Sequence, residues 1–170
     1  NSLAIGDGNT ASGSASFASG KNTTASGKQS TAVGNAGKAT GDGSFAGGYW
    51  NVNNGSSTAA GQSSFAFGEG ANAKSDHSLA FGNGATAIAN HAVAMGVGTI
   101  APARSSITLG RYNVNTFTSA DITQNAAGDP IFQLGSGSDN TNRWNTVTSF
   151  YLPNSPGWLA IGQSAANTMP

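Results

Sequence analysis

Small and large side chains alternate in short segments that return at a fixed interval along the chain. Residues 78–82 are typical: serine, leucine, alanine, phenylalanine and glycine follow one another. Strict alternation over five residues is typical of a β-strand. The central small residue of each segment recurs every 14 residues, with one step of 20, at Ala4, Ala18, Ala32, Ala46, Ala66, Ala80, Ala94 and Thr108. A period this short predicts an all-β solenoid with one repeat in each coil.

Each repeat also has a second, shorter half, which we expect to form another strand. It centres on alanine, as at Ala11 and Ala25, and is closed by a glycine. The closing glycines are Gly13, Gly27, Gly41 and Gly55. Each coil is therefore expected to run strand, turn, strand, turn. Successive coils would stack as parallel strands ~4.8 Å apart, so that the repeats make a rod of roughly 40 Å.

The two faces of the main strand differ in the size of their side chains. A flattened coil has room inside only for small residues, so we expect the alanines to face inward and the large residues outward. Left exposed, the large residues would form a continuous apolar stripe, which soluble monomers avoid. Association of several copies about a closed axis would cover it. The alternative is that the large residues fill the interior of their own chain and the alanines face out.

The stripe is uneven along the rod. Early coils include small residues at outward positions, such as Ser19 and Gly47, whereas later coils are uniformly bulky. We therefore expect the C-terminal half of the rod to contribute most of the association energy. The candidate interface residues are Leu3, Ile5, Phe65, Phe67, Leu79, Phe81, Val93, Met95, Ile107 and Leu109.

Composition argues against several classes of function. Seven basic and seven acidic residues give no net charge, so the basic patch that nucleic acid or an anionic membrane surface requires is absent. There is no cysteine and no apolar run long enough to enter a bilayer. The few carboxylates, such as Asp129 and Asp139, are scattered, and no nucleophile motif or phosphate loop accompanies them. We expect neither an enzyme nor a cofactor.

Residues 2–6, Ser-Leu-Ala-Ile-Gly, followed by four residues and Ala-x-Gly, resemble the head repeat of YadA-type trimeric autotransporter adhesins. The resemblance covers residues 1–110. It implies a left-handed parallel β-roll, a homotrimer and an extracellular location on a bacterial surface. It also implies attachment to a surface receptor, a glycan or the matrix. The chain begins inside a repeat, as expected of a fragment of a longer protein.

Residues 111–170 are expected to form a small β-rich cap. Residues 109–114 and 129–137 are similar to a segment that follows such repeats in tail-fibre-domain proteins of bacterial surfaces and phages. Residues 147–152 match its strand, and residues 158–162 would close a hairpin with that strand. A purely structural spacer of a phage or injection-system tail fibre, or of a surface stalk, is therefore the alternative to an adhesin.

The 20-residue step between Ala46 and Ala66 contains an insertion rich in aromatic and amide side chains. Insertions in solenoids map to loops that often bind, and aromatic rings beside amides suit carbohydrate. The alternative is that Tyr49 and Trp50 only cover the junction between coils. The candidate ligand contacts are Tyr49, Trp50, Asn51, Asn53 and Asn54, together with Trp144 and Trp158 in the cap.

Some polar residues also follow the repeat. His77 and His91 are one repeat apart, so their rings should stack on neighbouring coils. A stacked pair could bind a metal or sense pH, but only Asp76 accompanies it, and exposed polar residues are the simpler interpretation. We assign no metal site. Lys28 and Asp42 are likewise one repeat apart and are expected to lie on a solvated surface.

Overall fold

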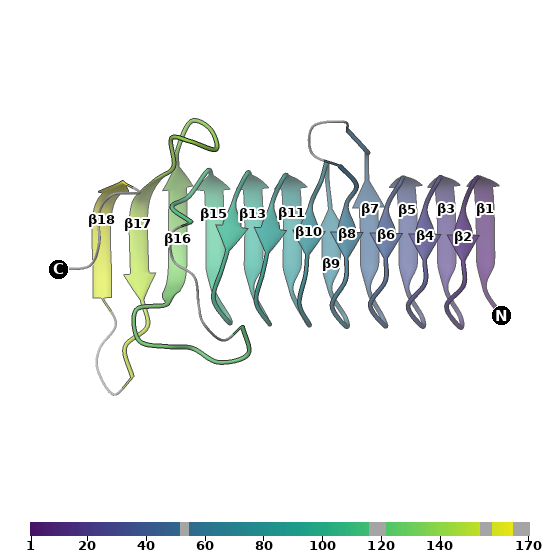
Figure 1. The fold of residues 1–170 in the computed structure, drawn as a ribbon, viewed down its shortest axis with the longest axis horizontal. Helices are drawn as coiled ribbons and strands as arrows, with labels where there is room; N and C mark the ends of the chain where they lie inside the picture. The colour runs from purple at the N-terminus through teal and green to yellow at the C-terminus, as the bar shows by residue number, and fades with distance from the viewer. Residues whose placement is uncertain (52–54, 116–121, 154–157, 165–170) are drawn as a thin grey trace.

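The computed structural model describes residues 1–51, 55–115, 122–153 and 158–164, and every regular element in these ranges is a β-strand. The strands form two sheets that run along a straight solenoid (Figure 1). One is an 11-stranded main sheet, and the other is a 7-stranded sheet of two-residue strands. The fold is the predicted β-solenoid with 14-residue coils.

Each coil contributes one long and one short strand, except the last, which contributes only a long one. The long strands are β1 (Leu3–Asp7), β3 (Phe17–Lys21), β5 (Thr31–Asn35), β7 (Phe45–Gly48), β9 (Phe65–Phe67), β11 (Leu79–Asn83), β13 (Val93–Val97) and β15 (Ile107–Arg111). The short strands are β2 (Thr10–Ala11), β4 (Thr24–Ala25), β6 (Lys38–Ala39), β8 (Thr58–Ala59), β10 (Asn72–Ala73), β12 (Thr86–Ala87) and β14 (Ile100–Ala101). Neighbouring coils pair in parallel with the register that the sequence period predicts, for example Ala4 with Ala18 and, across the long step, Ala46 with Ala66.

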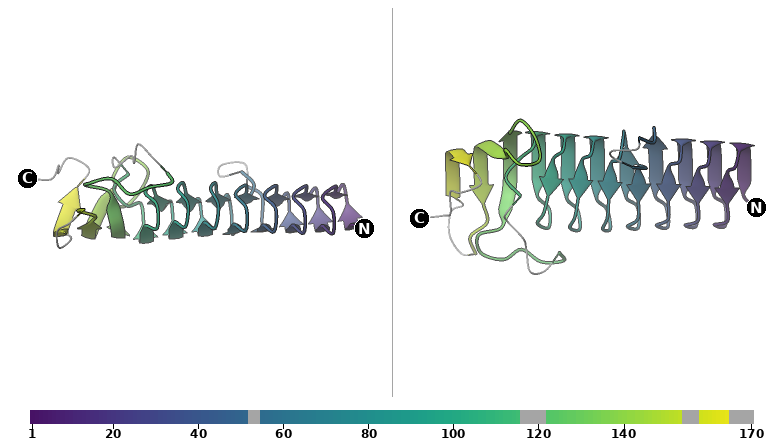
Figure 2. Two further views of the ribbon diagram at one scale, coloured as in Figure 1. Left: turned by 90° about the horizontal axis from the view of Figure 1, so that it is seen from below. Right: turned by 45° about the horizontal axis from the view of Figure 1, so that its top comes forward.

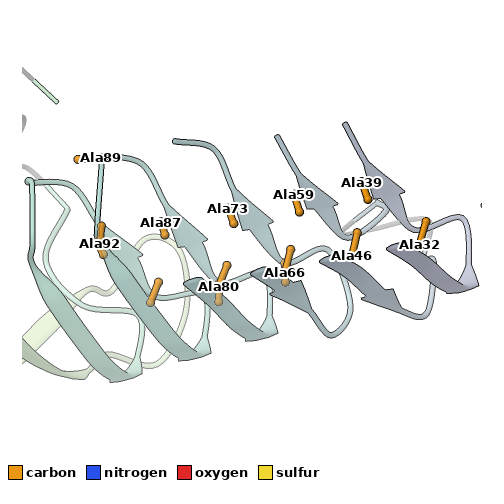
Figure 3. Close-up of a cluster of buried hydrophobic side chains, with 14 of the residues drawn as sticks. Ala32, Ala39, Ala46, Ala59, Ala66, Ala73, Ala80, Ala87, Ala89 and Ala92 are labelled. Carbon is orange, nitrogen blue, oxygen red and sulfur yellow. The ribbon is translucent and has the colours of Figure 1, made fainter. Parts of the chain in front are cut away.

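The interior of the solenoid is a double column of alanine side chains. Ala66 and Ala80 in the main sheet and Ala59 and Ala73 in the short sheet are each 0% exposed. Figure 3 shows the two columns directed toward each other across the coil. The space between the sheets holds methyl groups, so the large residues of the main strands lie on the outer face. The alternative in which large residues fill the interior is wrong.

The glycine at or near the end of each main strand is required by close stacking of the coils. Gly82 has a φ of +124°, and a β-carbon on it would clash with the carbonyl oxygen of Gly96 in the next coil. A side chain at this position is therefore excluded both by backbone conformation and by space.

The six extra residues of the long step precede the short strand β8. The glycine that closes this coil is consequently Gly61, because a β-carbon on Gly41 would clash with the carbonyl oxygen of Gly61. The sequence assignment of Gly55 to this role is wrong. Gly55 instead pairs with Asn51 inside the insertion, where its N–H donates to the Asn51 carbonyl oxygen at 2.7 Å.

The cap continues the main sheet without a break. Strand β16 (Pro130–Ser136) pairs in parallel with β15, although 25 residues rather than 14 separate the partners Ile107 and Phe132. Two antiparallel strands follow, β17 (Trp144–Phe150) and β18 (Trp158–Ser164). The predicted strand at 147–152 thus begins and ends slightly earlier, and the predicted hairpin with residues 158–162 is present (Figure 1).

The interior changes from apolar to polar where the cap begins. Thr108, Gln133 and Thr148 are partners in register and are buried, and they take the place of the alanine column. Asn113 closes the short sheet: its Oδ1 accepts from the Ile100 N–H at 2.7 Å, and its Nδ2 donates to the Ile100 carbonyl at 2.9 Å. The side-chain amide thereby supplies the two hydrogen bonds that another short strand would make.

Candidate functional site

Two rows of large apolar side chains run along the outer face of the main sheet. One row starts at Leu3 and the other at Ile5, which are 53% and 51% exposed. Because the coils are in register, side chains of one row lie above one another. Phe45 and Phe65 stack with ring centroids 4.9 Å apart, and Phe67 and Phe81 stack at 5.8 Å. Such stacked rings on neighbouring strands stabilise the sheet and present a flat apolar surface.

The apolar rows extend beyond the solenoid into the cap. Leu134 is the register partner of Leu109 on one side and of Val147 on the other, and Val147 pairs with Ile161. Leu159 and Ile161 are 62% and 75% exposed. We call the outward side chains of the main sheet from β1 to β18 the apolar face.

Sequence reasoning placed the end of these rows at Leu109 and missed the cap residues. The signal is present in the sequence, because Phe132-Gln133-Leu134-Gly135 and Leu159-Ala160-Ile161-Gly162 repeat the alternation of the solenoid strands. A search for a 14-residue period does not find these two segments, because their spacing differs from 14 residues and the last strands run antiparallel.

The segments that leave the solenoid project away from the apolar face. In Figure 2 (left), the connection between β16 and β17 rises on the side of the short strands, as do the described parts of the connection between β7 and β8. Neither of these described connections lies over the outer side of the main sheet. A flat partner surface could therefore contact the whole length of the apolar face.

The predicted aromatic ligand contacts fall in two separate places. Tyr49 and Trp50 follow β7 directly and are 63% and 45% exposed, with Asn51 next to them. Trp144, at the start of β17, is 51% exposed. Strands β9, β11, β13, β15 and β16 lie between the two places in the main sheet. Asn53, Asn54 and the side chain of Trp158 lie outside the part of the chain that is described.

The two histidines stack as predicted. The rings of His77 and His91 have centroids 5.0 Å apart and planes inclined by 10°. Both residues occupy the same left-handed turn position of consecutive coils, with φ of 57° and 60°, and both are exposed. The Asp76 carboxylate accepts from the Gln62 backbone N–H at 2.8 Å, in the preceding coil. No group of three or more His, Cys, Asp or Glu side chains suited to a metal occurs among the described residues.

Asp42 makes the same type of contact as Asp76. Its Oδ1 accepts from the backbone N–H of Lys28 at 2.8 Å, in the preceding coil. The side chains of Lys28 and Asp42 are both exposed, as expected of a solvated surface. These aspartates therefore fasten one coil's turn to the turn of the preceding coil.

A further feature that sequence reasoning missed is the side chain of Arg143, which is only 8% exposed. Its Nη1 donates to the carbonyl oxygens of Gly98 at 2.9 Å and Asn113 at 3.1 Å, and its Nη2 donates to Oδ1 of Asn140 at 2.8 Å. Burial lowers the pKa of Arg143, and the phenol of Tyr112 opposes this shift. The side chain holds the β16–β17 connection against the last coils.

Comparison with known proteins agrees with the solenoid geometry. No curated protein matches the chain. None of the described segments forms a helix capable of crossing a membrane. Residues 1–23, 25–49 and 59–85 match the family described as the YadA head domain repeat (2 copies). These three stretches within residues 1–85 are therefore similar to YadA head domain repeats.

Proposed function

We propose that this chain is a non-enzymatic segment of a trimeric adhesin fibre, which lies outside a bacterial cell and attaches it to a surface receptor, a glycan or the matrix. The observation that carries the proposal is the apolar face, which runs over all eleven strands of the main sheet. Exposed apolar patches of this extent mark interaction sites. The YadA head repeats in residues 1–85 support three as the number of copies.

Identical copies can cover the apolar face efficiently because it is straight and in register. If three chains surround an axis parallel to the rod, each coil meets the same coil of its two neighbours. Phe67, Phe81 and Met95 are 39%, 45% and 40% exposed in the single chain and would then be buried. Burial of apolar surface stabilises by about 25 cal/mol per Å², so the bulky later coils would dominate the association.

Assembly is tested by measuring the mass of the particle in solution. Sedimentation equilibrium at micromolar concentration is expected to give three times the 16.8 kDa of the chain. Phe81→Asp places a charge on the apolar face and is expected to dissociate the trimer. Ser26→Asp, an exposed position in the turn after β4, is the matched control. A folded particle of single-chain mass would contradict the proposal.

Attachment is tested with the exposed aromatic residues that follow β7. The trimer is expected to bind specific members of a glycan or matrix-protein array, and three copies on one rigid axis would add avidity to weak single contacts. Trp50→Ala is expected to abolish this binding, with assembly unchanged. Tyr49, Asn51, Asn53 and Asn54 are the other proposed contacts of this place, and Trp144 and Trp158 are those of the cap.

The second candidate function is a structural spacer in a phage or injection-system tail fibre or a surface stalk. The regular rod of stacked, in-register coils favours it. A trimer that binds no array member would support the spacer.

A further inference from the structure

A cleft of about 220 Å³ lies beside the turns that connect the long strands to the short ones near the cap. The turn after β11, the short strands β12 and β14, and the β16–β17 connection line it, with Asn83, Thr86, Ile100, Tyr112, Asn140 and Arg143 among the lining residues. This volume is below the range typical of drug-sized ligands and suits a ligand of one ring.

The wall of the cleft is built around the ring of Tyr112. Gly98 leaves room for this ring, since a β-carbon on Gly98 would clash with Cε1 and Cδ1 of Tyr112. The Arg143 guanidinium lies over the ring, 5.6 Å from its centroid. A cation over an aromatic face is held by the ring's negative potential, so the arginine is fixed in place before any ligand arrives.

Arg143 is a buried cation with incomplete hydrogen bonding. Its bonds to the described residues use both N–H groups of Nη1 and one of Nη2, and all three acceptors are uncharged oxygens. Of the five N–H donors of a guanidinium, the Nε donor and one Nη2 donor remain. No carboxylate forms an ion pair with Arg143 within the described ranges. A buried charge is costly unless it is paired, and an anionic ligand would supply the missing partner.

We propose that this cleft binds a single carboxylate-bearing sugar residue, whose carboxylate pairs with Arg143. The planar guanidinium presents its donors in a fixed fork, which matches the two oxygens of a carboxylate. Asn83, Thr86 and Asn140 bring amide and hydroxyl groups that suit sugar hydroxyls. Ile100 adds an apolar side chain for the C–H groups of the ring.

This inference rests on the proposed attachment function, because it names one class of receptor for it. The site is separate from the apolar face: apart from Asn83, the last residue of β11, its residues come from turns, short strands and the β16–β17 connection. It is also separate from the Tyr49–Trp50 insertion.

Isothermal titration of the full chain with sodium glucuronate, glucose and sodium sulfate tests the proposal. Glucuronate is expected to bind with a dissociation constant on the order of 1 mM, as a small polar ligand does, and glucose and sulfate at least roughly tenfold more weakly. Absence of glucuronate binding would overturn the proposal. If sulfate bound as tightly as glucuronate, the cleft would be a general anion site and not a sugar site. If glucose bound as tightly, the carboxylate would not contribute to binding. Either result would overturn the proposal.

Two matched pairs of variants locate the site. Thr86→Tyr fills the cleft, whereas Thr58→Tyr places the same side chain at the equivalent position of an earlier coil. Arg143→Lys keeps the charge without the two-point fork, and Arg111→Lys changes the other arginine beside Tyr112. The first member of each pair is expected to weaken glucuronate binding at least roughly tenfold, and the second to leave it unchanged. Unchanged binding in a folded Thr86→Tyr protein would overturn the location.

The outcome is distinguishable from that of the attachment experiment. Binding of glucuronate without attachment to any array would leave the cleft intact and refute the adhesin function. Attachment that is unaffected by Thr86→Tyr, without glucuronate binding, would refute the cleft and leave the adhesin function standing.

Discussion

The ring of Phe67 covers Gly47, its register partner on the neighbouring main strand. A β-carbon on Gly47 would lie 2.9 Å from Cδ2 of Phe67, 3.0 Å from Cγ2 of Val33 and 3.1 Å from Cε1 of Phe45, so these three side chains occupy the space that a side chain on Gly47 would need. The glycine of this row is thus the place where the aromatic stack of the later coils begins. A gap in the sequence pattern is filled by a neighbour's ring in the structure.

Gly47→Leu should displace the Phe67 ring and lower stability. The backbone of Gly47 does not have a positive φ, so the obstacle is the packed side chains. Inserting a side chain into such a contact costs about 1–3 kcal/mol. Thermal unfolding followed by circular dichroism measures the effect. Ser19→Leu, at the equivalent position two coils earlier, should change the melting temperature little. Equal melting of Gly47→Leu and wild type would refute the packing described.

Ala80→Leu should prevent folding or strongly destabilise the solenoid. The side chain of Ala80 is fully buried between the two sheets, in a column of alanines that are each 0% exposed. A larger side chain would separate the sheets of several coils at once, with a cost of at least ~1–3 kcal/mol. Ala60→Leu is the control, because Ala60 is exposed at the end of a short strand. Chemical denaturation of both variants would compare them, and similar midpoints would contradict the narrow interior.

Asp42→Ala should lower the free energy of unfolding by about 0.5–1.5 kcal/mol, the usual contribution of one hydrogen bond. It removes the acceptor for the Lys28 N–H. Asp42→Asn retains an oxygen in the same position and should restore most of the loss. Urea denaturation separates the two cases. If the asparagine variant were as unstable as the alanine variant, the carboxylate charge would be the cause and the hydrogen bond would not.

Because of Asp139, the stability of the cap should fall as the pH is lowered. The Asn142 and Thr141 side chains and then their backbone N–H groups donate to its carboxylate and hold its pKa well below the ordinary value of 3.8. A lowered pKa in the folded state means that the stabilisation is complete above the unfolded pKa and is lost as the pH falls below it. Between about pH 5 and pH 2, the melting temperature of the wild type should therefore fall by more than that of Asp139→Asn. Parallel curves for the two proteins would contradict this.

The repeat could be predicted because every coil lacks space for larger side chains at the same positions, and so has the same small residues there. An alanine column and a fixed glycine leave little choice of register, and the observed pairing of Ala4 with Ala18 follows from the period alone. The insertion was harder, because Gly55 imitates the repeat glycine at the expected distance. Only the stacking of Gly41 on Gly61 shows where the six extra residues lie.

The cleft at Arg143 could not be read from the sequence. Its hydrogen-bond partners Gly98 and Asn113 precede it by 45 and 30 residues, and neither spacing belongs to the period. The contact exists because β17 turns back antiparallel to β16, which brings the connection between them over the last coils. Binding sites made by such a reversal depend on the loop's path, which local pattern does not determine.

The amide of Asn113, which holds both main-chain groups of Ile100, also bears on how separate molecules behave. The last strand of a stack has unpaired main-chain N–H and C=O groups, and a strand of another molecule can pair with them. Fibrils grow in this way. Here this pairing is blocked at that end by one side chain. Asn113→Ala would expose the final short strand, and the variant is expected to aggregate end to end where the wild type stays dispersed.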